Sequence, residues 1–230
     1  MKISVIIPVL NEQHRVTSAV DRAWAAGADE VIVVDGGSTD QTVELAQKTT
    51  CSLLETTPTR AKQQNHGAQH ATGDVVLFLH VDNWLAPNAC DQIRTGLQDH
   101  KLGAGAFRQK IESKRSFLKW IERGNEKRVS WFNLAYGDQG IFVRKTLFEK
   151  IGGFPDVDFL EDYMISQKLR RQGKLLLLPG PLHVDPRRWE ANGPIGQTFR
   201  NWCIIAAYRM GVHPNRLHKY YAGKSNGNDS

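Results

Sequence analysis

Runs of apolar residues alternate along the chain with amphipathic stretches, and the two patterns predict different elements. Short runs rich in β-branched residues, at 3–9, 31–35 and 75–80 with a weaker one at 52–55, are typical of strands. Apolar residues recur at spacings of three and four over 13–26, which predicts a helix, and another helix is expected over 60–71. Strand, helix, strand at intervals of about thirty residues indicates βαβ units. We therefore expect an α/β fold with a mostly parallel central sheet flanked by helices.

The second half of the chain carries a less regular pattern. Strands are expected at 103–111 and 139–145 around a long polar helical stretch, followed by a helix over 159–173 and a last strand at 174–179. Earlier in the chain, Ser38 to Gln41 has the form of a capping box ahead of a short helix. We predict one domain over 1–221, with a basic helical segment at about 194–221 and a disordered tail at 222–230.

Composition and charge indicate an ordinary globular protein whose C-terminal part is basic. The 230 residues are 40% hydrophobic and 23% charged, as in ordinary soluble proteins. The net charge of +6 is uneven, because residues 1–163 carry 19 Lys and Arg against 21 Asp and Glu, whereas 164–230 carry 11 against 3. Nucleic acid, an anionic membrane, a phosphorylated small molecule and a plain solvated face all fit a basic end. No export signal is expected, and three widely spaced cysteines favour a reducing cytoplasm.

Polar side chains follow three of the predicted strands at the point where each strand ends. The first strand runs into Asn11 and Glu12, the second into Asp35, and the strand at 75–80 into His80 and Asp82. Asp and Gly after a strand are also common turn formers. Ligands of open parallel sheets bind at the carboxyl ends of the strands, so the coincidence of three polar strand ends predicts a binding site at that edge.

His80 and Asp82 are the first candidates for chemistry at this edge. On an extended backbone, residues two apart point to the same side, so both can face one ion. Mg²⁺ and Mn²⁺ are commonly held by one or two protein groups together with substrate phosphates, which predicts a metal that steadies a departing diphosphate. The alternative is that His80 bonds a backbone carbonyl and Asp82 caps the helix near Pro87.

Glu161 and Asp162 form a second acidic candidate. They begin the helix predicted over 159–173, where the helix dipole favours acidic residues without any further role. The glycines at 152–153 can form a turn that aims this helix start into the cleft. A carboxylate placed there can accept a proton from a hydroxyl nucleophile, so the pair is a candidate for the catalytic base.

The C-terminal part of the chain offers two basic candidates. Residues 185–189, Asp-Pro-Arg-Arg-Trp, combine guanidinium groups that suit phosphate with an indole that suits a sugar or base, although a basic surface loop is the plain alternative. Residues 195–221 mix aromatic and aliphatic side chains with arginines and lysines. Such a segment can lie on an anionic bilayer or pack on its own domain.

Four stretches in order along the chain resemble the inverting family 2 glycosyltransferases of the GT-A fold. They are SVIIPVLNE, EVIVVDGGSTDQT, GDVVLFLHVDNWLAP and GGFPDVDFLEDYMISQKLRRQG, and the likeness covers nearly all of the chain. Two more stretches, TRAKQQNHGAQHATGD and AYGDQGIFVRK, are similar to a small bacterial subgroup found beside radical-SAM and selenodomain genes.

The resemblance implies a role for each matching residue. It implies transfer of one sugar of hexose type from a nucleotide-diphospho-sugar, with Mn²⁺ or Mg²⁺ as the cofactor and no nucleic acid as a partner. The acceptor is unknown, and a lipid-linked one at the inner face of the plasma membrane fits. The implied donor-binding residues are Pro8, Leu10, Glu12, Asp35, Arg60, Lys62, Asp82, Arg188 and Trp189; the catalytic pair is Asp162, as the base, and Glu161; and the acceptor side is Tyr136, Asp138 and Gln139. The resemblance implies Asp82 as a metal ligand, and the direction of the side chains adds His80.

Departures from the family pattern keep other interpretations open. His80 stands where the family has the first Asp of its metal motif, and Leu10 stands where many members have a Tyr that stacks on the base. Gly36 replaces an acidic residue of the family, and Asp185 replaces a Gln of the processive members. The last change favours single sugar transfer. A non-catalytic nucleotide-sugar-binding module is one alternative, and a nucleotidyltransferase is another, although no Gly-rich basic loop follows the first strand.

Overall fold

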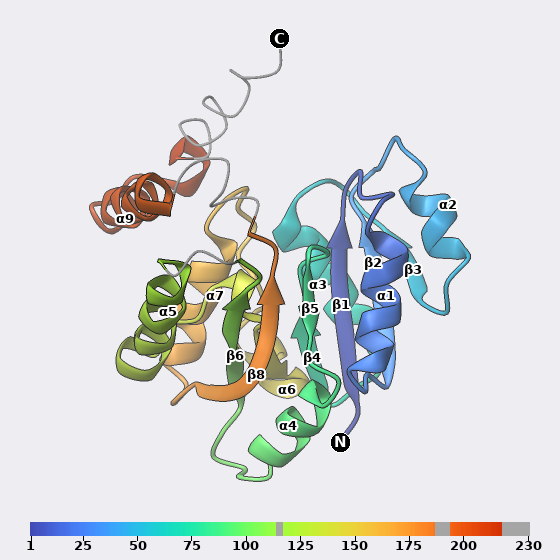
Figure 1. Ribbon diagram of the computed structural model, residues 1–230, viewed down its shortest axis with the longest axis horizontal. Coiled ribbons are helices and arrows are strands. Elements are labelled where there is room, and N and C mark those ends of the chain that lie inside the picture. Colours follow the sequence, from blue (N-terminus) through green and yellow to red (C-terminus); the bar gives the residue numbers. More distant parts are fainter. Residues whose placement is uncertain (114–116, 187–193, 218–230) are drawn as a thin grey trace.

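The computed structural model describes residues 1–113, 117–186 and 194–217, which are arranged around an eight-stranded sheet (Figure 1). Its order is β3-β2-β1-β4-β7-β6-β8-β5. The first four strands run parallel, β7 is antiparallel to both of its neighbours, β6 and β8 are parallel, and β5 is antiparallel to β8. The strands are β1 (Ile3–Val9), β2 (Glu30–Asp35), β3 (Ser52–Glu55), β4 (Val75–Phe78), β5 (Asn83–Leu85), β6 (Ala104–Ile111), β7 (Phe142–Arg144) and β8 (Leu176–Val184).

Helices cover both faces of the sheet, as the α/β prediction requires. One apolar cluster joins α1, α2 and α4 to one face, and a second joins α3, α5, α6 and α7 to the other. The helices are α1 (Val16–Ala25), α2 (Thr42–Gln47), α3 (Arg60–His70), α4 (Ala89–Gly96), α5 (Leu118–Phe132), α6 (Lys145–Lys150), α7 (Glu161–Arg170) and α9 (Pro194–Arg209), with a 3-10 turn, η1 (Gly137–Gln139).

Strand β4 is buried on both faces because it lies between these two layers. Val75 and Leu77 belong to the first apolar cluster, while Val76 and Phe78 belong to the second. All four side chains are 2% exposed or less. The strand predicted from this apolar run is thereby confirmed, but it ends at Phe78, two residues before the predicted end at 80.

The carboxyl ends of β1, β2 and β3 lie side by side at one edge of the sheet. Asp35 pairs with Val9 on one side and with Glu55 on the other. The buried Gln63 side chain donates hydrogen bonds from Nε2 to the carbonyls of Val9 (2.7 Å) and Val34 (2.8 Å) and so ties two of these strand ends together. Nothing in the sequence pattern pointed to this tie.

Several elements differ from the sequence prediction. The capping box at 38–41 does not form, because the Ser38 hydroxyl donates to Asp35 instead, and the Asp40 carboxylate accepts from the Thr42 N–H at 2.9 Å. The helix predicted over 13–26 begins at Val16, and the last strand extends to Val184. β5, α4 and α6 were not predicted because each is short, at 3, 8 and 6 residues.

The basic segment α9 packs on its own domain. Ile204, Ile205 and Tyr208 contact an apolar cluster that includes Leu160 and Tyr163. Arg209 Nε donates to the Tyr163 hydroxyl at 3.0 Å. Across the described ranges, the model contains no helix with both the length and the apolar character needed to span a bilayer. The two alternatives for this segment were contact with a bilayer and packing on its own domain. Its described part packs on the domain.

Candidate functional site

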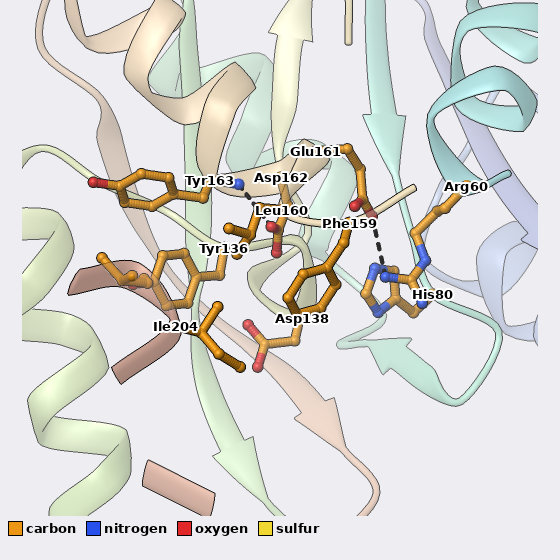
Figure 2. A pocket seen from close by; sticks show the side chains of 11 residues that line it. Arg60, His80, Tyr136, Asp138, Phe159, Leu160, Glu161, Asp162, Tyr163 and Ile204 are labelled. Atoms are coloured by element: carbon orange, nitrogen blue, oxygen red, sulfur yellow. Dashed lines mark hydrogen bonds and ion pairs between the residues drawn. The ribbon is translucent and has the colours of Figure 1, made fainter. Parts of the chain in front are cut away.

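A pocket of about 140 Å³ lies where the N-terminal end of α7 meets the segment after β4 (Figure 2). Its walls come from five parts of the chain that are far apart in sequence: the first residue of α3, the segment after β4, the η1 turn with Tyr136 before it, the entry to α7, and α9. The lining residues are Arg60, His80, Tyr136, Asp138, Phe159, Leu160, Glu161, Asp162, Tyr163, Ile204 and Ile205.

Glu161 forms a buried ion pair inside this pocket. Its Oε1 lies 3.1 Å from Arg60 Nη1, and the Glu161 side chain is 5% exposed against 44% for Arg60. Burial raises the pKa of Glu161 and the Asp162 charge adds to this, while Arg60 opposes both. Partial burial acts to lower the pKa of Arg60, but the carboxylates of Glu161, Asp162 and Asp82 outweigh this effect and raise that pKa. Arg60 therefore stays charged beside three carboxylates.

Asp162 is held differently from its neighbour. Its Oδ2 accepts a hydrogen bond from the Gly137 N–H at 2.8 Å, and its Oδ1 accepts from the Tyr163 N–H at 2.6 Å. Of the described cations, none forms an ion pair with it. Asp162 thus faces the pocket with both of its carboxylate oxygens held by backbone N–H groups.

The entry to α7 is held in an uncommon backbone conformation. Leu160, directly before the helix, has φ of 64°, a left-handed value that costs a bulky residue about 1 kcal/mol or more. The turn at Gly152 and Gly153 has positive φ at both residues. It is pinned to α3, because the Asn65 side chain exchanges two 2.9 Å hydrogen bonds with the Phe154 backbone. Glu161 and Asp162, at the helix start, line the pocket, and the aiming role of the glycine pair stays a prediction.

His80 and Asp82 lie on a turn and not on a strand. β4 ends at Phe78 and the Asn83 N–H bonds to the His80 carbonyl at 3.0 Å, so the alternation argument for the two side chains does not apply. A Cβ placed on Gly137 would lie 2.9 Å from His80 Nε2, which puts the imidazole against the η1 turn. Asp82 does not cap α4, whose N-cap position is Asn88. Within the described ranges no cluster of three metal-ligating side chains forms.

The three residues expected on the acceptor side take different positions. Tyr136 and Asp138 line the pocket. Burial raises the pKa of Tyr136 to about 12, so its phenol stays neutral, and the Arg128 guanidinium stacks 3.5 Å from the ring centre. Gln139 is fully buried behind the pocket, where its Oε1 accepts from Arg128 Nη2 at 2.7 Å. Gln139 thus supports the wall and is not part of it.

Four of the residues expected to bind the donor, Pro8, Leu10, Glu12 and Asp35, lie along the sheet edge and do not line this pocket. Leu10 is 46% exposed just after β1, whereas Pro8 is buried within it. The Glu12 carboxylate pairs with Arg15. Asp35 is only 2% exposed, and its Oδ2 accepts from the N–H groups of Gly37 and Ser38, both at 2.8 Å. The structure gives Asp35 a turn-holding role, and its contact with a base stays a prediction.

Three further residues predicted to bind the donor are Lys62, Arg188 and Trp189, of which the structure describes Lys62. Lys62 is exposed and lies 3.9 Å from the Asp156 carboxylate, a contact of little energetic weight at the surface. Arg188 and Trp189 lie outside the described residues.

Sequence reasoning missed the apolar wall of the pocket. Phe159 and Leu160 were predicted as ordinary helix residues, and Ile204 and Ile205 belonged to a segment expected either to lie on a bilayer or to pack on its own domain. The one available signal was that an apolar pair precedes the acidic pair at 161–162.

Comparison with known proteins identifies the family. The sequence model that describes the family "Glycosyl transferase family 2" matches residues 4–154 of this chain. The chain belongs to this family. A probable glycosyltransferase of Bacillus subtilis, YdaM, is 26% identical over 221 residues, which cover 82% of this chain and 52% of that protein. The chain therefore spans about half the length of this curated relative.

Solved structures show that this family 2 chain has the GT-A fold. TarS of Staphylococcus aureus, solved with UDP-GlcNAc, superposes with a TM-score of 0.66 at 19% identity, over 80% of this chain and 58% of that one. Glucosyl-3-phosphoglycerate synthase of Mycobacterium tuberculosis, solved with Mn²⁺, UDP and glucosyl-3-phosphoglycerate, gives 0.54 at 18% identity, over 80% and 70%. At this identity the likeness establishes the fold alone.

Proposed function

We propose that this glycosyltransferase moves a single hexose-type sugar from a nucleotide-diphospho-sugar to an acceptor hydroxyl with inversion at the sugar. The observation that carries the proposal is the contrast between two adjacent carboxylates. Glu161 forms an ion pair with Arg60, whereas Asp162 faces the pocket and, among the described residues, accepts hydrogen bonds from two backbone N–H groups without forming an ion pair. A carboxylate that no cation holds can accept a proton from a hydroxyl.

The proposed reaction is a direct displacement. The acceptor hydroxyl gives its proton to Asp162 as its oxygen forms a bond to the anomeric carbon of the donor. The bond from that carbon to the diphosphate oxygen breaks, and its electron pair leaves with the diphosphate. Because the acceptor enters opposite the leaving group, one such step inverts the configuration.

The donor diphosphate is proposed to lie near Arg60. This residue begins α3, so the partial positive charge of the helix N-terminus and the guanidinium act on the same place. Glu161 holds the guanidinium there, and Arg60 is 44% exposed and thus accessible. UDP-GlcNAc in one structure of the same fold and UDP in another support a nucleotide-diphosphate donor. Leu10, Glu12 and Asp35, at the neighbouring strand ends, are proposed to contact its nucleoside.

A divalent cation fits the charges at this edge. The carboxylates of Asp82, Glu161 and Asp162 all act on the Arg60 guanidinium, so three acidic groups of the described chain gather at this edge. Asp82 and His80 would hold the ion, since Mg²⁺ and Mn²⁺ need only one or two protein groups when a diphosphate supplies the rest. When bound, such an ion stabilises the charge that develops on a leaving diphosphate. The Mn²⁺ in one structure of the same fold supports this assignment.

The apolar wall is proposed to keep water from the base. Phe159, Leu160 and Ile204 surround the polar groups of the pocket. Excluding water favours transfer to the acceptor over hydrolysis of the donor. Tyr136, whose phenol stays neutral, and Asp138 are proposed to orient the acceptor. A lipid-linked acceptor and a cytoplasmic location stay predictions.

One experiment tests the proposal in two stages. Thermal unfolding with UDP, GDP, ADP and dTDP, each with and without Mn²⁺, identifies the nucleotide, because a ligand at about 100 times its Kd adds roughly 2.7 kcal/mol of stability. The matching sugar nucleotide is then assayed for nucleotide release and for the anomeric configuration of the product. Inverted product is expected. Binding without turnover on any acceptor would favour the non-catalytic module, and retained configuration would exclude the displacement.

A further inference from the structure

Helix α5 carries an exposed aromatic and basic surface that the proposed chemistry does not use. Trp120 and Trp131 are each 71% exposed, Phe132 is 58% exposed, and Phe117, just before the helix, is 44% exposed. Lys119, Arg123 and Lys127 are exposed on the same helix. Tryptophan is costly to leave in water unless it has a partner, and clustered exposed apolar side chains mark interaction sites. We refer to these seven residues as the α5 outer surface.

Helical geometry places the two tryptophans on one side. Trp120 and Trp131 are eleven residues apart, which is close to three full turns and about 16 Å along the axis. Lys127 lies between them, with its Nζ 5.2 Å from the centre of the Trp131 ring. The opposite side of the helix is fastened to the sheet through the buried Leu118 and Val129. In Figure 1, α5 lies at the edge of the molecule, on the side away from α1 and α2.

The acidic residues of α5 are held against the sheet, whereas its exposed charged residues are basic. Both of its acidic residues are engaged with β6, because Glu122 Oε1 accepts from the Ile111 N–H at 2.6 Å and Glu126 lies 3.7 Å from Arg108 Nε. The three exposed charged residues of the helix, Lys119, Arg123 and Lys127, are all cations. The α5 outer surface therefore combines positive charge with indole rings.

We propose that the α5 outer surface binds an anionic bilayer surface. Tryptophan rings settle at the level of lipid headgroups with the apolar part toward the acyl chains, and lysine and arginine beside them attract anionic lipids. The helix ends at Phe132, and Tyr136 of the pocket follows four residues later, at most about 14 Å of chain. Bilayer binding thus brings the pocket close to the membrane surface. The proposal does not depend on the proposed sugar transfer.

The experiment is flotation of the full chain with vesicles of 30% phosphatidylglycerol in phosphatidylcholine at low salt. Trp120→Ala/Trp131→Ala is expected to weaken binding at least about tenfold through lost apolar burial. Lys119→Gln/Lys127→Gln is expected to weaken it roughly 25-fold, about fivefold per charge. The matched control is Lys101→Gln/Lys150→Gln, an equal charge change at exposed sites on other elements, with little effect expected. Met210→Ala, 79% exposed after α9, is expected to bind as the wild type does.

Four results would overturn the proposal. These are no flotation of the wild-type chain at low salt, equal binding to pure phosphatidylcholine, an equal loss in the Lys101/Lys150 control, and binding to duplex DNA without binding to vesicles. All substituted side chains are exposed, so circular dichroism is expected to show an unchanged fold in every variant. Nucleotide-dependent stabilisation should be the same in all of them, which separates this test from that of the sugar transfer.

Discussion

The backbone N–H of Gly137 donates a 2.8 Å hydrogen bond to Oδ2 of Asp162, and the two residues lie close enough that a Cβ at 137 would be 3.3 Å from that oxygen. The same Cβ would lie 2.9 Å from His80 Nε2. The η1 turn thus positions the carboxylate and packs against the imidazole at one point. Glycine at 137 leaves the space that both side chains occupy.

Gly137→Ala is expected to impair turnover more than it impairs folding. The added methyl group displaces His80 or Asp162 by a few tenths of an ångström, and misplaced catalytic groups cost up to about 100-fold in rate. The measurement is turnover beside the urea unfolding midpoint. Gly124→Ala is the matched control, since nothing lies within 4 Å of a Cβ there, and in a helix interior it should add up to about 1 kcal/mol of stability. Equal turnover in both variants would count against a positioning role for Gly137.

Asp162→Asn is expected to reduce turnover by two to four orders of magnitude, roughly the worth of a general base, while donor affinity is retained. Asn keeps an oxygen that can accept from the Gly137 N–H, so the fold should persist. Asp158→Asn is the matched control, because Asp158 is exposed four residues earlier and does not line the pocket. Turnover within about tenfold of the wild type would rule out Asp162 as the base and direct attention to Glu161.

Asp82→Asn is expected to abolish the part of nucleotide stabilisation that depends on Mn²⁺, because the anionic ligand is lost while the shape is kept. His80→Ala should weaken the same effect less, since a neutral imidazole contributes no charge. Thermal shifts with nucleotide, with and without Mn²⁺, measure both. Asp21→Asn, at an exposed position on α1, serves as the control and should respond as the wild type does. A full metal response in the Asp82 variant would exclude this site.

The stability of the fold is expected to depend on pH through Glu161. Burial raises the pKa of Glu161 above its unfolded value, so this residue favours folding most at low pH and that contribution is lost as the pH rises through the folded pKa. Each unit of raised pKa corresponds to about 1.4 kcal/mol. As the pH rises from 5 to 8, the urea unfolding midpoint of Glu161→Gln should therefore increase relative to that of the wild type.

The control for this pH effect is Glu44→Gln. The Lys48 hydrogen bond lowers the pKa of Glu44, which is fully exposed, so its effect should be small and of opposite sign. An unchanged difference between wild type and Glu161→Gln across this pH range would show that the raised pKa of Glu161 does not affect stability.

Local pattern determined much of the fold. The apolar runs at 3–9, 31–35 and 75–80 and the helical spacing over 60–71 predicted β1, β2, β4 and α3 to within a few residues, because burial on a strand or a helix face imposes a period that the sequence must carry. The polar residues that follow these strands, and the acidic pair at 161–162, were likewise readable as site candidates. The family resemblance from these motifs is confirmed.

Only the tertiary structure decided how these candidates are used. Arg60 and Glu161 are 101 residues apart and Gly137 and Asp162 are 25 apart, so no local period records either contact. The separation of an ion-paired Glu161 from a pocket-facing Asp162 depends on which partner each carboxylate meets after folding. The same holds for Ile204 and Ile205, whose apolar side chains suit a membrane or a pocket equally well in the sequence. Hydrophobic burial is non-directional, and only the packing of the whole chain selects the surface that it covers.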